Sequence, residues 1–248
     1  MQRSKPIPYS QRTQKITRAE LKQVPTPEGS ETWRPISYYE LITTFDKVMS
    51  EHNVNLQREE IFIQRGGNLM YAVIDLQRGY GSKLPKAKDV GWSMGIMSSL
   101  NKRVGVQILA GLRVLSNDNL LFSTDHIGLK RRYTSRTNLH DVISDGFEDF
   151  VQNYKILAED IERMKGTLVN DNQARLVIFE VFYKQIFPIK WLRHVTKLYL
   201  DPEQKEFKPG NLWSLINAIA SCAHKLPPGR RFLALKELAK TFHRISKD

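Results

Sequence analysis

The chain has 248 residues, of which 41% are hydrophobic and 26% are charged, and it contains one cysteine. This composition is typical of a globular protein with a buried core and argues against a disordered chain. No uncharged apolar stretch approaches the length of a membrane span, and no apolar segment follows the basic N-terminus, so we expect neither a spanning helix nor a secretory signal. The lone Cys222 excludes a disulfide framework and indicates a reducing, cytoplasmic setting.

Positive charge is the strongest global feature of the sequence. Lys and Arg number 38 against 26 Asp and Glu, which gives a formal net charge of +12. Such an excess is typical of proteins that bind polyanions, nucleic acids above all. The excess is concentrated in residues 1–24, 78–88 and 101–136, whereas residues 138–185 are acidic. This separation predicts one surface that faces a polyanion and a helical region with another role.

The N-terminal third predicts an arm, a helix and a hairpin. Residues 1–32 are basic, contain four prolines and show no hydrophobic period, so we expect a mobile arm. Apolar residues at steps of three and four over 37–52 predict a helix, with Ser37 as its N-cap. Two β-type runs at 60–65 and 68–77 flank Gly66 and Gly67, which is a hairpin signal.

Further strands and then helices follow a basic loop at 79–89. The strands are expected at 90–100, 107–115 and 120–124, although residues 103–110 could equally form a short helix. A long helix should begin at Asn138 and end before Gly166, and the later helices should cover 173–187, 190–200, 211–223 and 229–245. The fold class is therefore α+β, with an antiparallel or mixed sheet in residues 55–125 backed by helices and an all-helical C-terminal half. The expected domains are the arm 1–32, an α+β core 33–170 with a basic groove, and a helical region 171–248 packed on the core.

The sequence contains no familiar catalytic motif. Phosphate-binding glycine loops, zinc-protease and serine-hydrolase signatures and paired cysteines are all missing, and the six histidines lack metal-ligand spacing. We therefore expect no enzyme activity, no cofactor and no metal. The alternative is a nuclease that uses Asp118, Asp125 and His126 to hold a divalent cation, although such residues more often cap turns.

Basic residues interleaved with aromatic residues point to nucleic acid. Residues 128–136 place four cations around Tyr133. The hairpin with Arg65 and Arg78 at its ends, beside the basic loop 79–89 with Tyr80, could form the other wall of a groove. Guanidinium groups bind phosphates and exposed tyrosines stack on bases, without reading a sequence. The alternative is a solvated run of charge with Tyr133 packed inward. The predicted nucleic-acid-binding residues are Arg78, Tyr80, Lys83, Lys86, Lys88, Lys102, Arg103, Arg113, Lys130, Arg131, Arg132, Tyr133 and Arg136.

Five segments resemble, in order, sequence blocks of the phage- and plasmid-encoded family called domain of unknown function 932. These segments are residues 33–42, 95–102, 113–122, 129–134 and 211–218. The chain departs from the family's usual pattern at Met97–Asn101 and at Asn117, which puts chemistry based on the family's His, Asp or Cys in doubt. The resemblance implies a protein of a phage or plasmid, and therefore the cytoplasm of a bacterial host cell as its location. By analogy it also suggests the single-strand annealing proteins of the Red-beta and RecT kind, which form rings or filaments on DNA.

Together these observations predict a non-sequence-specific single-stranded DNA-binding and annealing protein that takes part in recombination. It would act as an oligomer and without covalent chemistry, and the sequence does not separate DNA from RNA as its partner. The alternative is a protein–protein interaction factor, such as an inhibitor of host defence or a replication accessory protein. In either case host or phage replication and recombination proteins are candidate partners.

Overall fold

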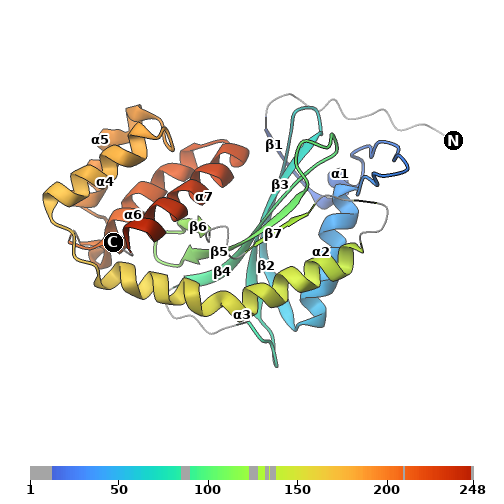
Figure 1. Ribbon diagram of the computed structural model, residues 1–248, viewed down its shortest axis with the longest axis horizontal. Coiled ribbons are helices and arrows are strands. Elements are labelled where there is room, and N and C mark those ends of the chain that lie inside the picture. The colour runs from blue at the N-terminus through green and yellow to red at the C-terminus, as the bar shows by residue number, and fades with distance from the viewer. Residues whose placement is uncertain are drawn as a thin grey trace. The chain divides into compact units, whose positions relative to one another are not determined.

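The computed structural model describes residues 13–84, 90–122, 128–131, 134, 138–208 and 210–246. Its strands are β1 (Gln14–Ile16), β2 (Val54–Gln64), β3 (Leu69–Arg78), β4 (Val90–Ser99), β5 (Val106–Val114), β6 (Leu120–Phe122) and β7 (Gly128–Arg131). Its α-helices are α1 (Arg18–Leu21), α2 (Tyr38–Glu51), α3 (Leu139–Gly166), α4 (Asp171–Tyr183), α5 (Leu192–Leu200), α6 (Leu212–Ala220) and α7 (Pro228–Ile245). Short 3-10 helices cover Ile189–Trp191, Lys205–Phe207 and Ser221–Lys225. The predicted α+β class with a helical C-terminal half is confirmed (Figure 1).

The described strands form one sheet in which β1 to β6 are neighbours in chain order and β7 pairs with β5. The hairpin between β2 and β3 is antiparallel, and its turn contains Gly66 and Gly67 with φ of 66° and 88°. Only glycine adopts this left-handed conformation without steric cost, so the two glycines fix the predicted turn. β6 pairs with the second half of β5 and β7 with its first half, both antiparallel.

The chain divides into two compact units, and the division falls inside α3, between Val151 and Gln152. Unit 1 holds β1 to β3, most of β4, the first half of β5, β7, α1, α2 and the start of α3. Unit 2 holds the rest of β5, β6, the rest of α3 and the helices α4 to α7. The division therefore differs from the expected boundary at residue 170, because one continuous helix contributes to both units.

In unit 1, α2 and the start of α3 cover the strands (Figure 1). Ser37 caps α2 by accepting a hydrogen bond at Oγ from the backbone N–H of Glu40, at 3.0 Å. The ring of Phe150 on α3 meets the ring of Trp92 on β4 edge-on, with centroids 5.5 Å apart. The apolar face of α2, as the spacing predicts, is buried at Tyr38, Leu41, Ile42, Phe45, Val48 and Met49.

The N-terminal region is part of unit 1 from residue 14 onward, which corrects the prediction of a mobile arm over 1–32. β1 pairs with β2 in an antiparallel register that places Ile16 opposite Ile61. Ile16 and Leu21 are buried, and Arg18 forms ion pairs with Asp46 and Glu59. A three-residue strand has too few residues to show a period, so the sequence pattern did not reveal it. Residues 1–12 lie outside the described part of the chain.

Unit 2 is built around α6, whose nine residues are all buried. α4, α5 and α7 are found where the periodicity predicts helices, although α4 ends at Tyr183 and the end of the expected helix 211–223 is a 3-10 turn. Among the described residues no helix combines the length and apolar character that crossing a membrane requires.

Candidate nucleic-acid interface

The sheet separates the predicted nucleic-acid-binding residues of unit 1 into two groups. Lys102 and Arg103 lie in the turn between β4 and β5, beyond Ser99, which pairs with the first residue of β3. Arg78 is the last residue of β3, so Tyr80 and Lys83 follow at its other end. A strand of 10 residues spans roughly 30 Å at about 3.3 Å per residue. The two groups therefore lie at opposite ends of β3.

The end with the turns gathers cations from separate parts of the chain. Leu100 donates a backbone hydrogen bond to the carbonyl of Asn68 at 3.1 Å, which joins the β4–β5 turn to the β2–β3 turn. The Lys102 ammonium lies 4.6 Å from the centroid of the Trp33 ring. We call this group the turn cluster, and its members are the exposed Arg34, Arg65, Lys102 and Arg103 and the half-buried Trp33.

The cations of the turn cluster are available to an anionic ligand. Within the part of the chain that the structure describes, no carboxylate forms an ion pair with any of the four. By contrast Arg18 and Lys15, also in unit 1, each pair with an acidic side chain. Four cations without counterions, beside a tryptophan face, can bind phosphates and stack a base.

Two cations of the turn cluster are held in a backbone conformation that is unfavourable for their side chains. Arg65 has φ of 57° and Lys102 has φ of 64°. This left-handed region favours glycine and costs other residues on the order of 1 kcal/mol. A long basic side chain at the tip of each of two neighbouring turns, where glycine would be more stable, is the kind of local strain that often accompanies a binding role.

Residues 128–131 contribute to the sheet in a way that the sequence did not predict. Gly128–Arg131 forms β7, and Arg131 pairs with Val106, the first residue of β5 after the β4–β5 turn. The backbone of this basic segment therefore reaches the end of the sheet that carries the turn cluster. The predicted site residues whose side chains lie outside the described part of the chain are Lys130, Arg131, Arg132, Tyr133 and Arg136.

Arg113 is buried in the fold and is not exposed on the surface. It lies in the part of β5 that belongs to unit 2, is buried, and donates a hydrogen bond from its guanidinium to the Asp118 carboxylate at 3.1 Å. Because this guanidinium is buried and already paired, it contributes to the β5–β6 turn more directly than to a nucleic-acid surface. Asp118 is engaged by the same pair, and Asp125 and His126 of the alternative metal site lie outside the described residues.

The opposite end of β3 is more open but more loosely organised. The Arg78 guanidinium donates a hydrogen bond to the Ser82 carbonyl at 3.3 Å, while Tyr80 is fully exposed and Lys83 is exposed. Tyr80 could stack on a base, but no described side chain packs against its ring to hold it in place. The remaining predicted cations of this loop, Lys86 and Lys88, lie outside the described part of the chain.

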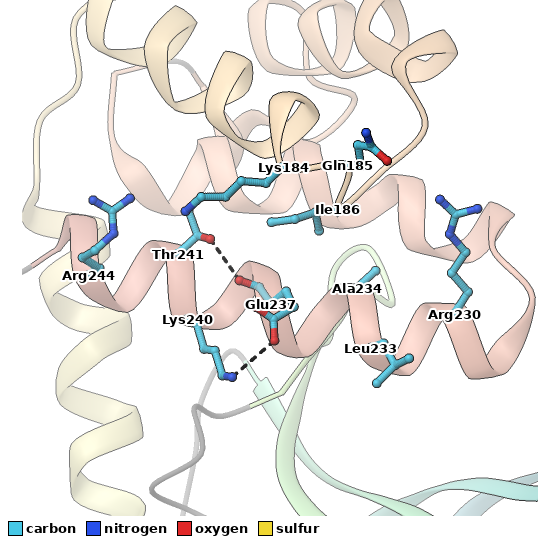
Figure 2. A pocket seen from close by; sticks show the side chains of 10 residues that line it. All are labelled: Lys184, Gln185, Ile186, Arg230, Leu233, Ala234, Glu237, Lys240, Thr241 and Arg244. Atoms are coloured by element: carbon cyan, nitrogen blue, oxygen red, sulfur yellow. Dashed lines mark hydrogen bonds and ion pairs between the residues drawn. The ribbon is translucent and has the colours of Figure 1, made fainter. Parts of the chain in front are cut away.

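Unit 2 has a basic hollow of about 630 Å³ between the end of α4 and α7 (Figure 2). Much of its charge is neutralised, because Lys184 and Arg244 both pair with Glu180, and Lys240 pairs with Glu237. In Figure 2 the Arg230 side chain extends away from these pairs at one end of the hollow. Arg230 and Lys240 belong to α7, whereas Lys184 directly follows α4 more than forty residues earlier, so the hollow cannot be read from the sequence pattern.

The turn cluster also contains residues that were not among the predicted binding residues. Trp33 and Arg34 precede the first expected helix, and only the fold brings Trp33 to Lys102. Arg65 was expected at one end of the hairpin, as part of a groove wall, and the hydrogen bond between Leu100 and Asn68 joins its turn to that of Lys102. The described residues contain no group of three or more His, Cys, Asp or Glu side chains that could hold a metal ion.

No protein-family model, curated protein or solved structure matches the chain. The resemblance to the phage and plasmid family therefore stays a prediction.

Proposed function

We propose that the chain binds single-stranded nucleic acid without sequence specificity, and that the turn cluster supplies a principal contact surface. The observation that carries this proposal is a group of four exposed cations beside Trp33 with no acidic partner among the described residues. The cations would neutralise phosphates and release counterions, and the indole would offer a face to an unpaired base. Annealing of complementary strands would follow if bound strands keep their base edges free.

The test is binding of a fluorescent oligonucleotide, followed by anisotropy at several salt concentrations. Single- and double-stranded forms of one sequence are compared, using protein freed of nucleic acid with nuclease. We expect tighter binding of the single strand and a steep loss of affinity with salt. Absence of binding at low salt would overturn the proposal. A preference for the duplex would overturn the single-strand assignment.

A second candidate function is self-association through the surface of α4 and α5. Phe179 and Tyr183 on α4 are largely exposed with their rings stacked at 5.6 Å, and Leu176 and Leu200 are exposed as well. These residues adjoin or line an apolar hollow of about 600 Å³ between the two helices. Exposed apolar surface of this kind marks contact sites between proteins, and an annealing protein would need a second copy of itself.

Sedimentation of the wild-type chain and a Phe179→Ser, Tyr183→Ser variant tests this candidate. We expect the wild type to form oligomers and the variant to be monomeric, with unchanged thermal unfolding because both rings are mostly exposed in one chain. A monomeric wild type, with and without single-stranded DNA, would contradict self-association.

A further inference from the structure

The apolar hollow between α4 and α5 belongs to a surface that is large enough to be a protein interface. Phe179 and Tyr183, which form part of its wall, are 64% and 74% exposed. We call this surface the α4–α5 patch, and its exposed apolar members are Leu176, Phe179, Tyr183, Ile189, Leu192 and Leu200. At roughly 100 Å² of exposed side chain each, they offer an apolar area close to the roughly 800 Å² that each partner buries in a standard interface. Apolar area of this size on one face marks a contact site.

The interior of the hollow offers little to a polar ligand. The Thr196 hydroxyl donates to the Leu192 carbonyl at 3.0 Å, and the Tyr199 hydroxyl accepts a hydrogen bond from the backbone N–H of Gly210 at 3.3 Å. The apolar side chains buried in the hollow are Ala174, Ile178 and Phe182. A polar ligand would give up hydrogen bonds to water here without replacing them. The occupant of the hollow therefore has an apolar body.

Two opposite charges stand at one end of the hollow. Asp171 and Arg175 both line it, both are exposed, and they lie one helical turn apart on α4. Neither forms an ion pair within the part of the chain that the structure describes. An occupant that matches this end must bring a cation to Asp171 and an anion to Arg175, beside an apolar surface.

The same surface of a second copy meets all three requirements. In a two-fold contact each surface meets itself, so Asp171 of one copy faces Arg175 of the other, and a single symmetry operation forms both pairs. The exposed rings of each copy supply the apolar body. The two charges also balance, whereas the chain as a whole carries +12. Copies with this net charge repel one another, so a face with balanced charges is where they can meet.

We propose that two copies of the chain pack their α4–α5 patches together about a two-fold axis, with Asp171 of each copy paired with Arg175 of the other. Apolar side chains of each copy then cover Phe179 and Tyr183 of its partner. This inference rests on the self-association proposed above and adds its geometry. A two-fold contact occupies the patch on both copies, so assembly through it stops at the dimer, and a ring or filament needs another surface.

Charge reversal tests the pairing by sedimentation equilibrium at low salt. Asp171→Arg and Arg175→Asp should each raise the Kd of the dimer about tenfold, because two exposed ion pairs per dimer become two repulsive contacts. The double variant Asp171→Arg, Arg175→Asp exchanges the charges and should restore the Kd to within about threefold of the wild type. The matched control is Glu159→Arg, which makes the same change at an exposed position of α3 in unit 2 and should leave the Kd unchanged.

A single cysteine tests the two-fold axis. Asn172 is exposed and lies between Asp171 and Arg175 in the sequence of α4, so the two copies of residue 172 come close together in this arrangement. A short bismaleimide linker should join Asn172→Cys into covalent dimers and into nothing larger. The native Cys222 is buried and does not compete. Lys155→Cys, at an exposed position of α3, is the control and should not be joined.

The two-fold geometry is overturned if the double variant dissociates as readily as the single variants, or if Asn172→Cys gives no covalent dimer or a ladder of larger products. Self-association itself still stands in those cases if the wild type forms oligomers and Phe179→Ser, Tyr183→Ser is monomeric. A monomeric wild type overturns both. Anisotropy with labelled single-stranded DNA reports separately on the turn cluster, so a failure there is distinguishable from a failure of the dimer.

Discussion

The double variant Arg65→Gly, Lys102→Gly separates a binding role of the turn cluster from a structural one. Both residues have left-handed backbone angles, with φ of 57° and 64°, so glycine fits each turn without steric strain. The change removes two exposed cations that have no ion-pair partner among the described residues. Most substitutions that remove a charge affect both folding and binding, whereas these two should affect mainly the binding of the ligand.

The expected magnitudes follow from the local geometry. Relief of the left-handed strain stabilises each turn by on the order of 1 kcal/mol. Two effects oppose this stabilisation, each by about 0.5–1 kcal/mol. One is the loss of the exposed Lys102–Trp33 interaction, and the other is the greater conformational entropy that glycine gives the unfolded chain. The free energy of unfolding should therefore change by no more than about 1 kcal/mol per site. Removal of one cation that neutralises a phosphate should reduce the slope of log K against log salt by about 0.7, and removal of both should reduce it by about 1.4.

The assay is anisotropy with labelled single-stranded DNA over a salt series, with urea unfolding run on the same preparations. Between about 50 and 200 mM salt, the affinity of the double variant should fall roughly sevenfold less than that of the wild type. The control is Lys47→Gln, Lys155→Gln, which removes two exposed helical cations elsewhere and changes the net charge equally. An unchanged slope in the glycine variant, or an equal reduction in the control, would refute a site at the turn cluster.

Three further predictions concern the fold itself. Gly79→Ala would place a Cβ 2.5 Å from the Asn53 carbonyl oxygen, and urea unfolding should show a loss of about 1–3 kcal/mol. Burial raises the pKa of the Cys222 thiol to about 11, so a thiol reagent at about pH 8 should modify it far more slowly in the native protein than after unfolding. A hydrogen bond from Lys184 is the main cause that lowers the pKa of Glu180, so the stabilisation is present above about pH 4.5, the pKa in the unfolded chain, and is lost as the pH falls through the lower native pKa. Acid unfolding of Glu180→Gln should lack that step.

The parts of the fold that the sequence predicts well are those in which a long hydrophobic period meets a clear boundary residue. α2 begins after its Ser37 cap, and α3 runs from Leu139 to Gly166 as the apolar spacing requires. β1 and β7 were missed for a different reason. Each is short and polar, and each is a strand only because β2 or β5 offers it an edge to pair with. This pairing depends on the tertiary structure, and no local hydrophobic period in the sequence indicates it.

The candidate interface was only partly predictable, because the sequence shows how many charged residues there are but not which of them form ion pairs. Arg113 and Lys102 are equivalent in composition, yet one is buried against Asp118 and the other is exposed beside Trp33. Lys102 and Arg78 lie at opposite ends of β3, roughly 30 Å apart, which the sequence does not show. The turn that carries Lys102 and the turn that carries Arg65 are joined by the backbone hydrogen bond from Leu100 to Asn68, residues that are far apart in the sequence.

The chain has a net charge of +12, and the distribution of ion pairs shows which of its cations are neutralised and which remain available to a ligand. In unit 2 the basic hollow between α4 and α7 is largely neutralised by Glu180 and Glu237, so its cations chiefly stabilise helix packing. At the turn cluster, acidic partners are missing from the described residues, and backbone strain is accepted where glycine would be more stable. Unpaired cations repel one another, so a protein that keeps several together at a strained edge bears a small cost in stability. A bound strand of phosphates would offset that cost, which is why this edge, rather than the more basic-looking loop after β3, is where we place the nucleic acid.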